Sequence, residues 1–163
     1  MLAELRNRLG DELERLSHEL TVRIPDELAS SQAGPTLETT LELERVVQRR
    51  VRLLGQLVAG LAAADPRTIW PDRAGYGSTV RVRDIARGDE ETYTLLTGDL
   101  IDPRDGQISL ASPIGNALLG RRAGEEITVI TPWGARRYEI LLLATLPQKL
   151  GVDVGEPDAR RVA

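Results

Sequence analysis

The first 61 residues carry two apolar stripes with helical spacing, and no other feature of the chain constrains its fold as strongly. Apolar residues of the first stripe recur every three or four positions, which places them on one face of an amphipathic helix. Such a face needs an apolar partner, and the second stripe has the alternating three-four spacing of a coiled-coil seam. The first stripe is Leu2, Leu5, Leu9, Leu13, Leu16, Leu20, Ile24 and Leu28. The second is Leu37, Val47, Val51, Leu54, Val58 and Leu61, with Thr40 and Glu44 as its polar interruptions. Together they predict two helices that pack against each other.

The segment between the stripes predicts a reversal of the chain. Gly34 can end a helix in the left-handed conformation, Pro35 cannot continue that helix, and the Thr36 hydroxyl can cap the next one. We therefore predict an antiparallel coiled-coil hairpin over residues 1–65. Pro25 interrupts the first stripe, which predicts either one kinked helix or a break between two helices.

The second half of the chain has the pattern of a small sheet. Residues 66–77 are rich in proline, glycine and charge and predict a linker. Beyond them, alternating residues predict strands over 79–85 and 90–96, and further strands are expected at 107–110, 127–131 and 137–143, with a short helix over 113–119. The predicted fold class is α+β, a helical hairpin followed by an antiparallel β-sheet domain over 78–147 with one short helix. Residues 148–163 are predicted to be a disordered tail.

Composition excludes several classes of function. The chain has no cysteine and a single histidine, His18, so it holds no disulfide and no multi-histidine or thiolate metal site. Its net charge of −4 argues against direct binding to duplex DNA. No apolar run approaches the roughly 20 residues that span a bilayer, and the first residues lack the pattern of a signal peptide, so we expect a cytoplasmic protein and no membrane contact.

Two neighbouring segments resemble a known family. The first reads Ser-Pro-Ile-Gly-Asn-Ala-Leu-Leu-Gly over residues 112–120, and the second reads Gly-Glu-Glu-Ile-Thr-Val-Ile-Thr-Pro-Trp-Gly over residues 124–134. Together with strands near 77–80 and 137–140, they resemble the C-terminal domain of the GreA/GreB transcript-cleavage factors. The resemblance implies an FKBP-like sheet domain that docks on a coiled coil of the β′ subunit at the RNA polymerase secondary channel, with the protein acting as a monomer.

The same resemblance implies which residues make that contact. The candidates lie in the loop and helix that open the first segment, and they are Ser112, Pro113, Ile114, Asn116 and Leu119. Local structure explains two of them equally well, because Ser112 can cap a helix whose first residue is Pro113. Trp70 and Trp133 are interpreted as packing residues.

The hairpin tip departs from the family. Gre factors carry a Gly-Asp-Leu-Ser-Glu-Asn motif there, whose two acids help to hold the catalytic Mg²⁺ of the polymerase, a hard ion that takes oxygen ligands. The corresponding residues 34–39 read Gly-Pro-Thr-Leu-Glu-Thr. Glu38 matches the family glutamate, whereas Pro35 replaces the aspartate and Thr39 the asparagine. Each limb of the hairpin is also about one helical turn short, which withdraws the tip by roughly 6 Å.

These departures predict a polymerase-binding regulator without efficient cleavage, no intrinsic enzyme activity, and no cofactor beyond the Mg²⁺ of the polymerase if the tip reaches it. Glu42, one turn after Glu38, shares its face and is interpreted as an acid that favours the helix N-terminus rather than as a metal ligand. Two alternatives stay open: an active cleavage factor that uses Glu38, and a regulator resembling the Rnk proteins. A prolyl isomerase is disfavoured, because the few aromatic residues do not indicate the apolar pocket that such an enzyme needs.

Overall fold

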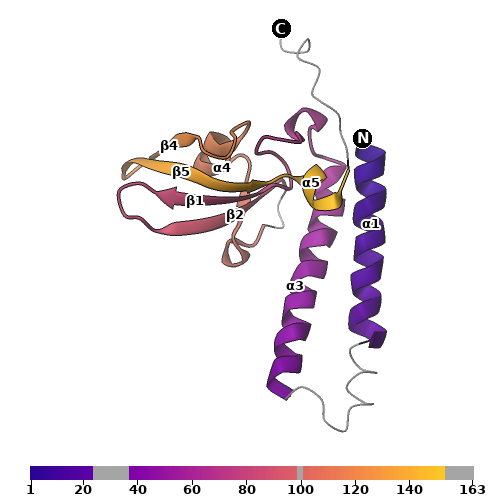
Figure 1. The fold of residues 1–163 in the computed structure, drawn as a ribbon. Coiled ribbons are helices and arrows are strands. Elements are labelled where there is room, and N and C mark those ends of the chain that lie inside the picture. Colours follow the sequence, from indigo (N-terminus) through magenta and orange to yellow (C-terminus); the bar gives the residue numbers. More distant parts are fainter. Residues whose placement is uncertain (24–36, 99–100, 153–163) are drawn as a thin grey trace.

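The computed structural model describes residues 1–23, 37–98 and 101–152, which form a long helical pair beside a small sheet (Figure 1). Helix α1, Leu2–His18, ends in a π-helical turn, η1, Glu19–Arg23. Helix α3, Leu37–Leu61, runs back alongside α1 (Figure 1). Pro25 lies outside the described residues, so the choice between a kink and a break stays a prediction. None of the helices in the described ranges is long and apolar enough to cross a membrane.

The seam between α1 and α3 forms from the predicted stripes. Leu5, Leu9 and Leu16 of α1 are buried, and α3 buries Val47, Leu54 and Leu61 against them in the same core cluster. Leu57 of α3 is also buried, although it lies outside the predicted stripe. It belongs to the same cluster as Tyr76 and Leu146 from the second half of the chain, which indicates that α3 packs on two sides.

The sheet contains five strands in the order β3-β2-β1-β5-β4. Their bounds are β1 Thr79–Asp84, β2 Glu90–Leu96, β3 Gln107–Ser109, β4 Glu126–Thr131 and β5 Gly134–Ala144. Three of the pairings are antiparallel, as predicted, but β3 joins β2 in parallel, so the sheet is mixed. The chain between β2 and β3 includes the 3₁₀ turn η3, Pro103–Asp105, and brings Gln107 back beside Thr94, so that β3 pairs with the last residues of β2.

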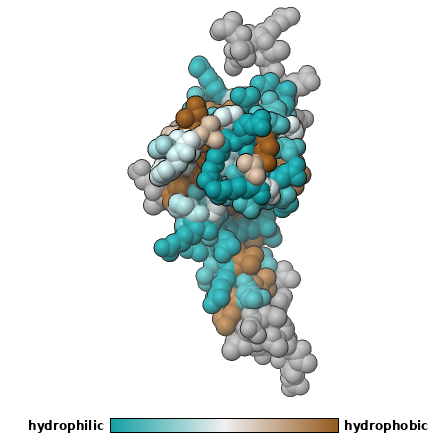
Figure 2. Space-filling view, turned by 90° about the vertical axis from the view of Figure 1, so that its left-hand side faces the viewer, coloured by the Kyte–Doolittle hydropathy of each residue, from teal (hydrophilic) through white to brown (hydrophobic). Residues whose placement is uncertain are grey.

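The short helix α4, Pro113–Leu118, contacts β4. Its Leu118 is fully buried in a second apolar cluster with Val80, Val82 and Ile140 of the sheet. The predicted fold class, helices followed by a sheet with one short helix, is therefore confirmed. The end of the sheet domain seen in Figure 2 is largely hydrophilic, with small separate hydrophobic areas.

The two halves of the molecule share a core. Residues 66–77, predicted to be a linker, include the 3₁₀ turn η2, Pro66–Thr68, and bury Ile69 and Tyr76. A last helix, α5, Leu146–Leu150, follows β5 and contacts α1. Helix α5 was not predicted, and it extends past residue 148, where we expected the tail to begin. Residues 153–163 of that tail lie outside the described part of the chain.

Candidate functional site

The loop that leads into α4 is fixed by hydrogen bonds from two serines. The Ser112 hydroxyl donates to the Ser109 carbonyl oxygen over 2.7 Å and accepts from the Gly115 amide over 3.1 Å. The Ala111 amide donates to the Ser109 hydroxyl over 3.1 Å. Pro113 occupies the first turn of α4, where a missing amide hydrogen costs no helical hydrogen bond. The motif therefore builds a rigid corner, and Ser112 acts first as its helix cap.

The predicted contact residues of this corner differ in exposure. Asn116 and Pro113 are exposed, whereas Ile114 is half-buried and packs against the sheet core. Leu119, directly after α4, is also half-buried. Gly115 is buried so closely against the Ser109 carbonyl that any Cβ at that position would collide with it. Of the five candidates, Asn116 and Pro113 are thus the side chains most available to a partner.

The hairpin tip lies only partly within the described residues. Gly34, Pro35 and Thr36 fall outside them, and for Glu38 and Thr39 the structure describes the helical backbone alone. Glu42 is exposed on α3. Across the ranges 1–23, 37–98 and 101–152, no group of three or more acidic or histidine residues is arranged to hold a metal. The tip donors known from the sequence, Glu38 and Glu42, do not make up the pair that the family uses for Mg²⁺, because Pro35 has no side-chain oxygen.

Two neighbouring arginines of α3, Arg49 and Arg50, make ion pairs with other elements. Arg50 lies 3.4 Å from Glu12 of α1, and Arg49 lies 3.2 Å from Asp105 of η3. Glu12 also accepts a hydrogen bond from the Arg15 guanidinium over 2.7 Å. This hydrogen bond and the positive charges of Arg15 and Arg50 lower the pKa of Glu12. Arg49 and Arg50 therefore connect α3 to the rest of the molecule.

Three side chains have surroundings that the sequence did not reveal. The Lys149 ammonium, on the only lysine of the chain, donates to the Gly77 carbonyl over 2.9 Å and to the Thr79 hydroxyl. Although much of the Lys149 residue is exposed, desolvation of the ammonium lowers its pKa to about 8. Burial raises the pKa of Tyr76 to about 12. Trp133, interpreted as a packing residue, is instead 92% exposed in the turn between β4 and β5. That interpretation was wrong, because the turn projects beyond the sheet core.

One sequence pattern could have located Lys149. Residues 145–148 read Thr-Leu-Pro-Gln, a capping box that predicts the start of a helix. In the structure the Gln148 amide donates to the Thr145 hydroxyl over 3.4 Å, and the Thr145 amide donates to the Gln148 side chain over 3.1 Å. This reciprocal pair begins α5 and places Lys149 beside the start of β1.

Comparison with known proteins agrees with this architecture. The family model described as transcription elongation factor GreA/GreB, C-terminal, matches residues 70–144. The transcription elongation factor GreA of Solidesulfovibrio magneticus is 34% identical over 142 residues, which cover 84% of this chain and 87% of that protein. GreA of an Anaeromyxobacter species is 31% identical over 149 residues, 88% of this chain and 90% of that one.

A solved structure, that of GreA factor homolog 1 from Thermus thermophilus, superposes with a TM-score of 0.39 at 21% identity, over 85% of this chain and 94% of that one. The sequence relatives are covered nearly from end to end, so the match includes the helical half as well as the sheet domain. The family model and the sequence relatives define a protein of the transcription elongation factor class. The chain belongs to the GreA/GreB family.

Proposed function

We propose that this protein is a regulator of bacterial RNA polymerase that docks at the secondary channel through its sheet domain and does not support efficient transcript cleavage. In this proposal the hairpin of α1 and α3 enters the channel while the corner before α4 contacts the polymerase. The protein then limits access of active Gre factors to the same channel. The relatives are named transcription elongation factors, which supports the polymerase as partner.

The docking half of the proposal is supported by the geometry of α4. The Ser112 cap and the close contact of Gly115 with Ser109 hold the corner rigid before any partner arrives, which lowers the entropy lost on binding. Asn116 is exposed at this corner, and its side chain carries both an amide donor and a carbonyl acceptor. We assign to Asn116 the central polar contact with the polymerase.

The observation that carries the absence of cleavage is Pro35. A proline offers no oxygen to a metal ion, whereas the family pair of acids helps to hold Mg²⁺, which would supply hydroxide and neutralise charge during phosphodiester cleavage. Of the two acids in the family pair, Glu38 alone remains. We infer that one carboxylate positions the ion too weakly for efficient cleavage.

A competition assay tests the proposal. RNA cleavage is measured in a purified backtracked polymerase complex with an active Gre factor at fixed concentration, while this protein is added in increasing excess. We expect the cleavage rate to fall toward the rate of the polymerase alone. A rate that does not change would show that the protein does not occupy the channel, and a rate that rises would show that it is itself active.

Two variants separate docking from folding. Asn116→Ala removes an exposed polar side chain, so it should weaken the competition and leave the thermal midpoint unchanged. Thr128→Ala, at an exposed position on β4, is the matched control and should compete as the unmodified protein does. If both variants compete equally well, Asn116 does not contribute to docking.

The second candidate, an active cleavage factor, is favoured by the retention of Glu38. If it is correct, this protein stimulates cleavage when added alone, and Glu38→Ala abolishes the stimulation. An unchanged rate in that variant would leave Glu38 without a catalytic role.

A further inference from the structure

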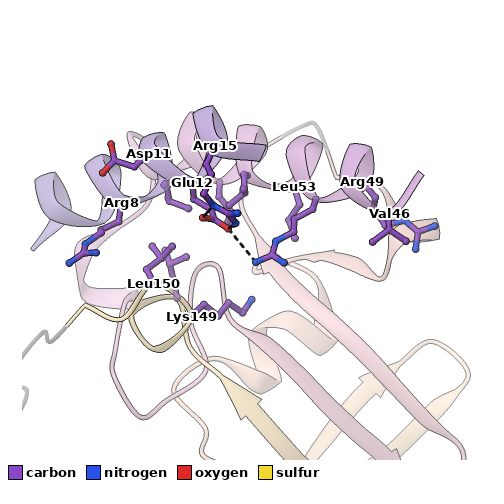
Figure 3. Close-up of a pocket in the computed structure, with 14 residues that line it drawn as sticks. Arg8, Asp11, Glu12, Arg15, Val46, Arg49, Leu53, Lys149 and Leu150 are labelled. Atoms are coloured by element: carbon purple, nitrogen blue, oxygen red, sulfur yellow. Dashed lines mark hydrogen bonds and ion pairs between the residues drawn. The ribbon is translucent and has the colours of Figure 1, made fainter. Parts of the chain in front are cut away.

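An open groove of about 720 Å³ runs between the helical pair and α5 (Figure 3). Its walls come from all three helices: Figure 3 shows Arg8 and Glu12 of α1 and Leu53 of α3 on one side, with Lys149 and Leu150 of α5 on the other. The groove contains neither the predicted hairpin tip nor the corner at Ser112. It is therefore a separate surface.

The floor of the groove is apolar. It is formed by the leucines Leu9, Leu53, Leu54, Leu57, Leu146 and Leu150. Leu53 and Leu150 are only half-buried, and Val46 at the open end is 61% exposed. The groove persists because α5 has only five residues and covers the helices near the sheet alone. Leu9, Leu54, Leu57 and Leu146 are buried in the core, so Leu53, Leu150 and Val46 supply the apolar surface that is open to solvent. Exposed apolar side chains gathered along one groove are typical of a surface that another element covers.

The rim of the groove is predominantly basic. Five cationic side chains line it, Arg8, Arg15, Arg49, Arg50 and Lys149, against two acids, Asp11 and Glu12. Glu12 is already shared by Arg15 and Arg50, at 2.7 and 3.4 Å, and Arg49 is paired with Asp105 at 3.2 Å. Arg8 has no hydrogen bond or ion pair with any other residue in the described ranges. In a chain of net charge −4, this local excess of positive charge favours an acidic occupant.

The spacing of the lining residues on α3 matches a helical occupant. Val46, Arg50, Leu53 and Leu57 lie at intervals of four, three and four, so they share one face of α3. From Val46 to Leu57 this face extends on the order of 16 Å, or about three helical turns. A third helix laid along it would complete a small bundle with α1 and α3, with its apolar stripe on the leucines and its flanks against the arginines.

We propose that this groove binds an acidic amphipathic helix of a partner protein, with leucine-like residues at three-four spacing flanked by aspartate or glutamate. The apolar side chains supply the contact area, while Arg8 and Arg15 of α1 and Arg49 and Arg50 of α3 select against basic helices. This inference goes beyond the proposed docking at the polymerase and does not rest on it. Binding requires the full chain, because α5 closes one side of the groove.

Synthetic helices test the proposal on the purified protein without polymerase. The probe is a fluorescein-labelled peptide of about five helical turns with a leucine stripe flanked by glutamates. One control peptide has the same leucines flanked by lysines, and another has the acidic composition with the stripe scrambled. Fluorescence anisotropy should show saturable binding of the acidic striped peptide and at least about tenfold weaker binding of both controls.

Matched variants locate the binding. Val46→Ser and Arg8→Glu should each weaken binding of the acidic peptide by roughly fivefold or more. The control variants are Leu43→Ser and Arg6→Glu, which change exposed residues of the same two helices outside the groove and should bind normally. All four positions are exposed, so circular dichroism is expected to show an unchanged fold.

Two results would overturn the proposal. The first is binding that does not distinguish the acidic striped peptide from its controls or the groove variants from theirs. The second is that the acidic striped peptide does not bind, while dodecanoate binds saturably to the protein and more weakly to the groove variants. That result would make the groove a site for a small anionic amphiphile instead.

Discussion

The Tyr76 hydroxyl donates a hydrogen bond to the carbonyl oxygen of Leu57 over 2.9 Å. This bond joins the residue that leads into the sheet to the last turns of α3, across 19 positions of the chain. Tyr76 is 1% exposed, so the bond is shielded from water. Two further contacts tie the same parts together: Gln107 to Gln56 at 2.9 Å, and Arg49 to Asp105 at 3.2 Å. The orientation of the hairpin against the sheet is therefore set by specific pairs.

Replacing Tyr76 by phenylalanine removes this bond and keeps the ring. We expect the free energy of unfolding to fall by about 1 kcal/mol, the typical net contribution of one intramolecular hydrogen bond. Urea unfolding measures the change. Tyr93→Phe is the control, because Tyr93 is half-buried and its hydroxyl has no hydrogen-bond partner among the described residues. Equal stability of the two variants would contradict the assigned role of the Tyr76 hydroxyl.

Two glycines of α3 should respond to alanine in opposite directions. A Cβ added at Gly60 would lie 2.5 Å from the Tyr76 hydroxyl oxygen, whereas a Cβ at Gly55 meets nothing within 4 Å. Alanine favours a helix interior over glycine by about 1 kcal/mol. Gly55→Ala should therefore raise the thermal midpoint. Gly60→Ala should lower the midpoint, because the ring of Tyr76 must move. If both variants raised the midpoint equally, the contact between Gly60 and Tyr76 would have adjusted to the added methyl group without loss of stability.

The stability of the protein should rise with pH between about 8 and 10.5 through Lys149. Desolvation lowers the pKa of this amine to about 8 in the folded protein, from an ordinary value of 10.5. In that window the unfolded chain binds more protons than the folded chain, so raising the pH favours folding. Unfolding free energies are compared at a lower pH near 7.5 and a higher pH near 9.5 for the protein and for Lys149→Met.

The protein should gain stability relative to Lys149→Met over this interval. Tyr76 does not interfere, because its pKa is raised to about 12 and its contribution is lost only above the ordinary tyrosine value of 10.0. A difference between protein and variant that stays constant with pH would show that the Lys149 amine titrates normally.

If Pro35 is the reason that the protein does not support efficient cleavage, placing an acid at position 35 should restore cleavage. Pro35→Asp, alone and with Thr39→Asn, is tested with a backtracked polymerase complex. We expect the cleavage rate to rise by about 10- to 100-fold, the usual effect of one group that supports a metal site. Pro35→Ala is the control and should stay inactive. If the cleavage rate rises in neither Pro35→Asp variant, the shorter limbs of the hairpin, rather than Pro35, would explain the lack of cleavage.

The sequence predicted correctly those features that depend on residues close together in the chain. The three-four spacing of Leu5, Leu9 and Leu16 can bury only one face of a helix, and the structure buries that face. Ser112 and Pro113 begin α4 as expected, because capping is a property of neighbouring residues. The parallel pairing of β3 was missed, because strand direction depends on where the intervening chain leads rather than on the residues of the strand.

The sequence by itself determined the two long helices, the strands, the capped corner at Ser112 and the loss of an acid at Pro35, since each depends on residue type and on spacing within a few positions. Only the tertiary structure decided that Tyr76 meets Leu57, that Lys149 approaches Gly77, and that the basic groove opens between α1, α3 and α5. These relationships join residues far apart in the chain. Their distances depend on how the completed elements pack, and periodicity within one element carries no information about that packing.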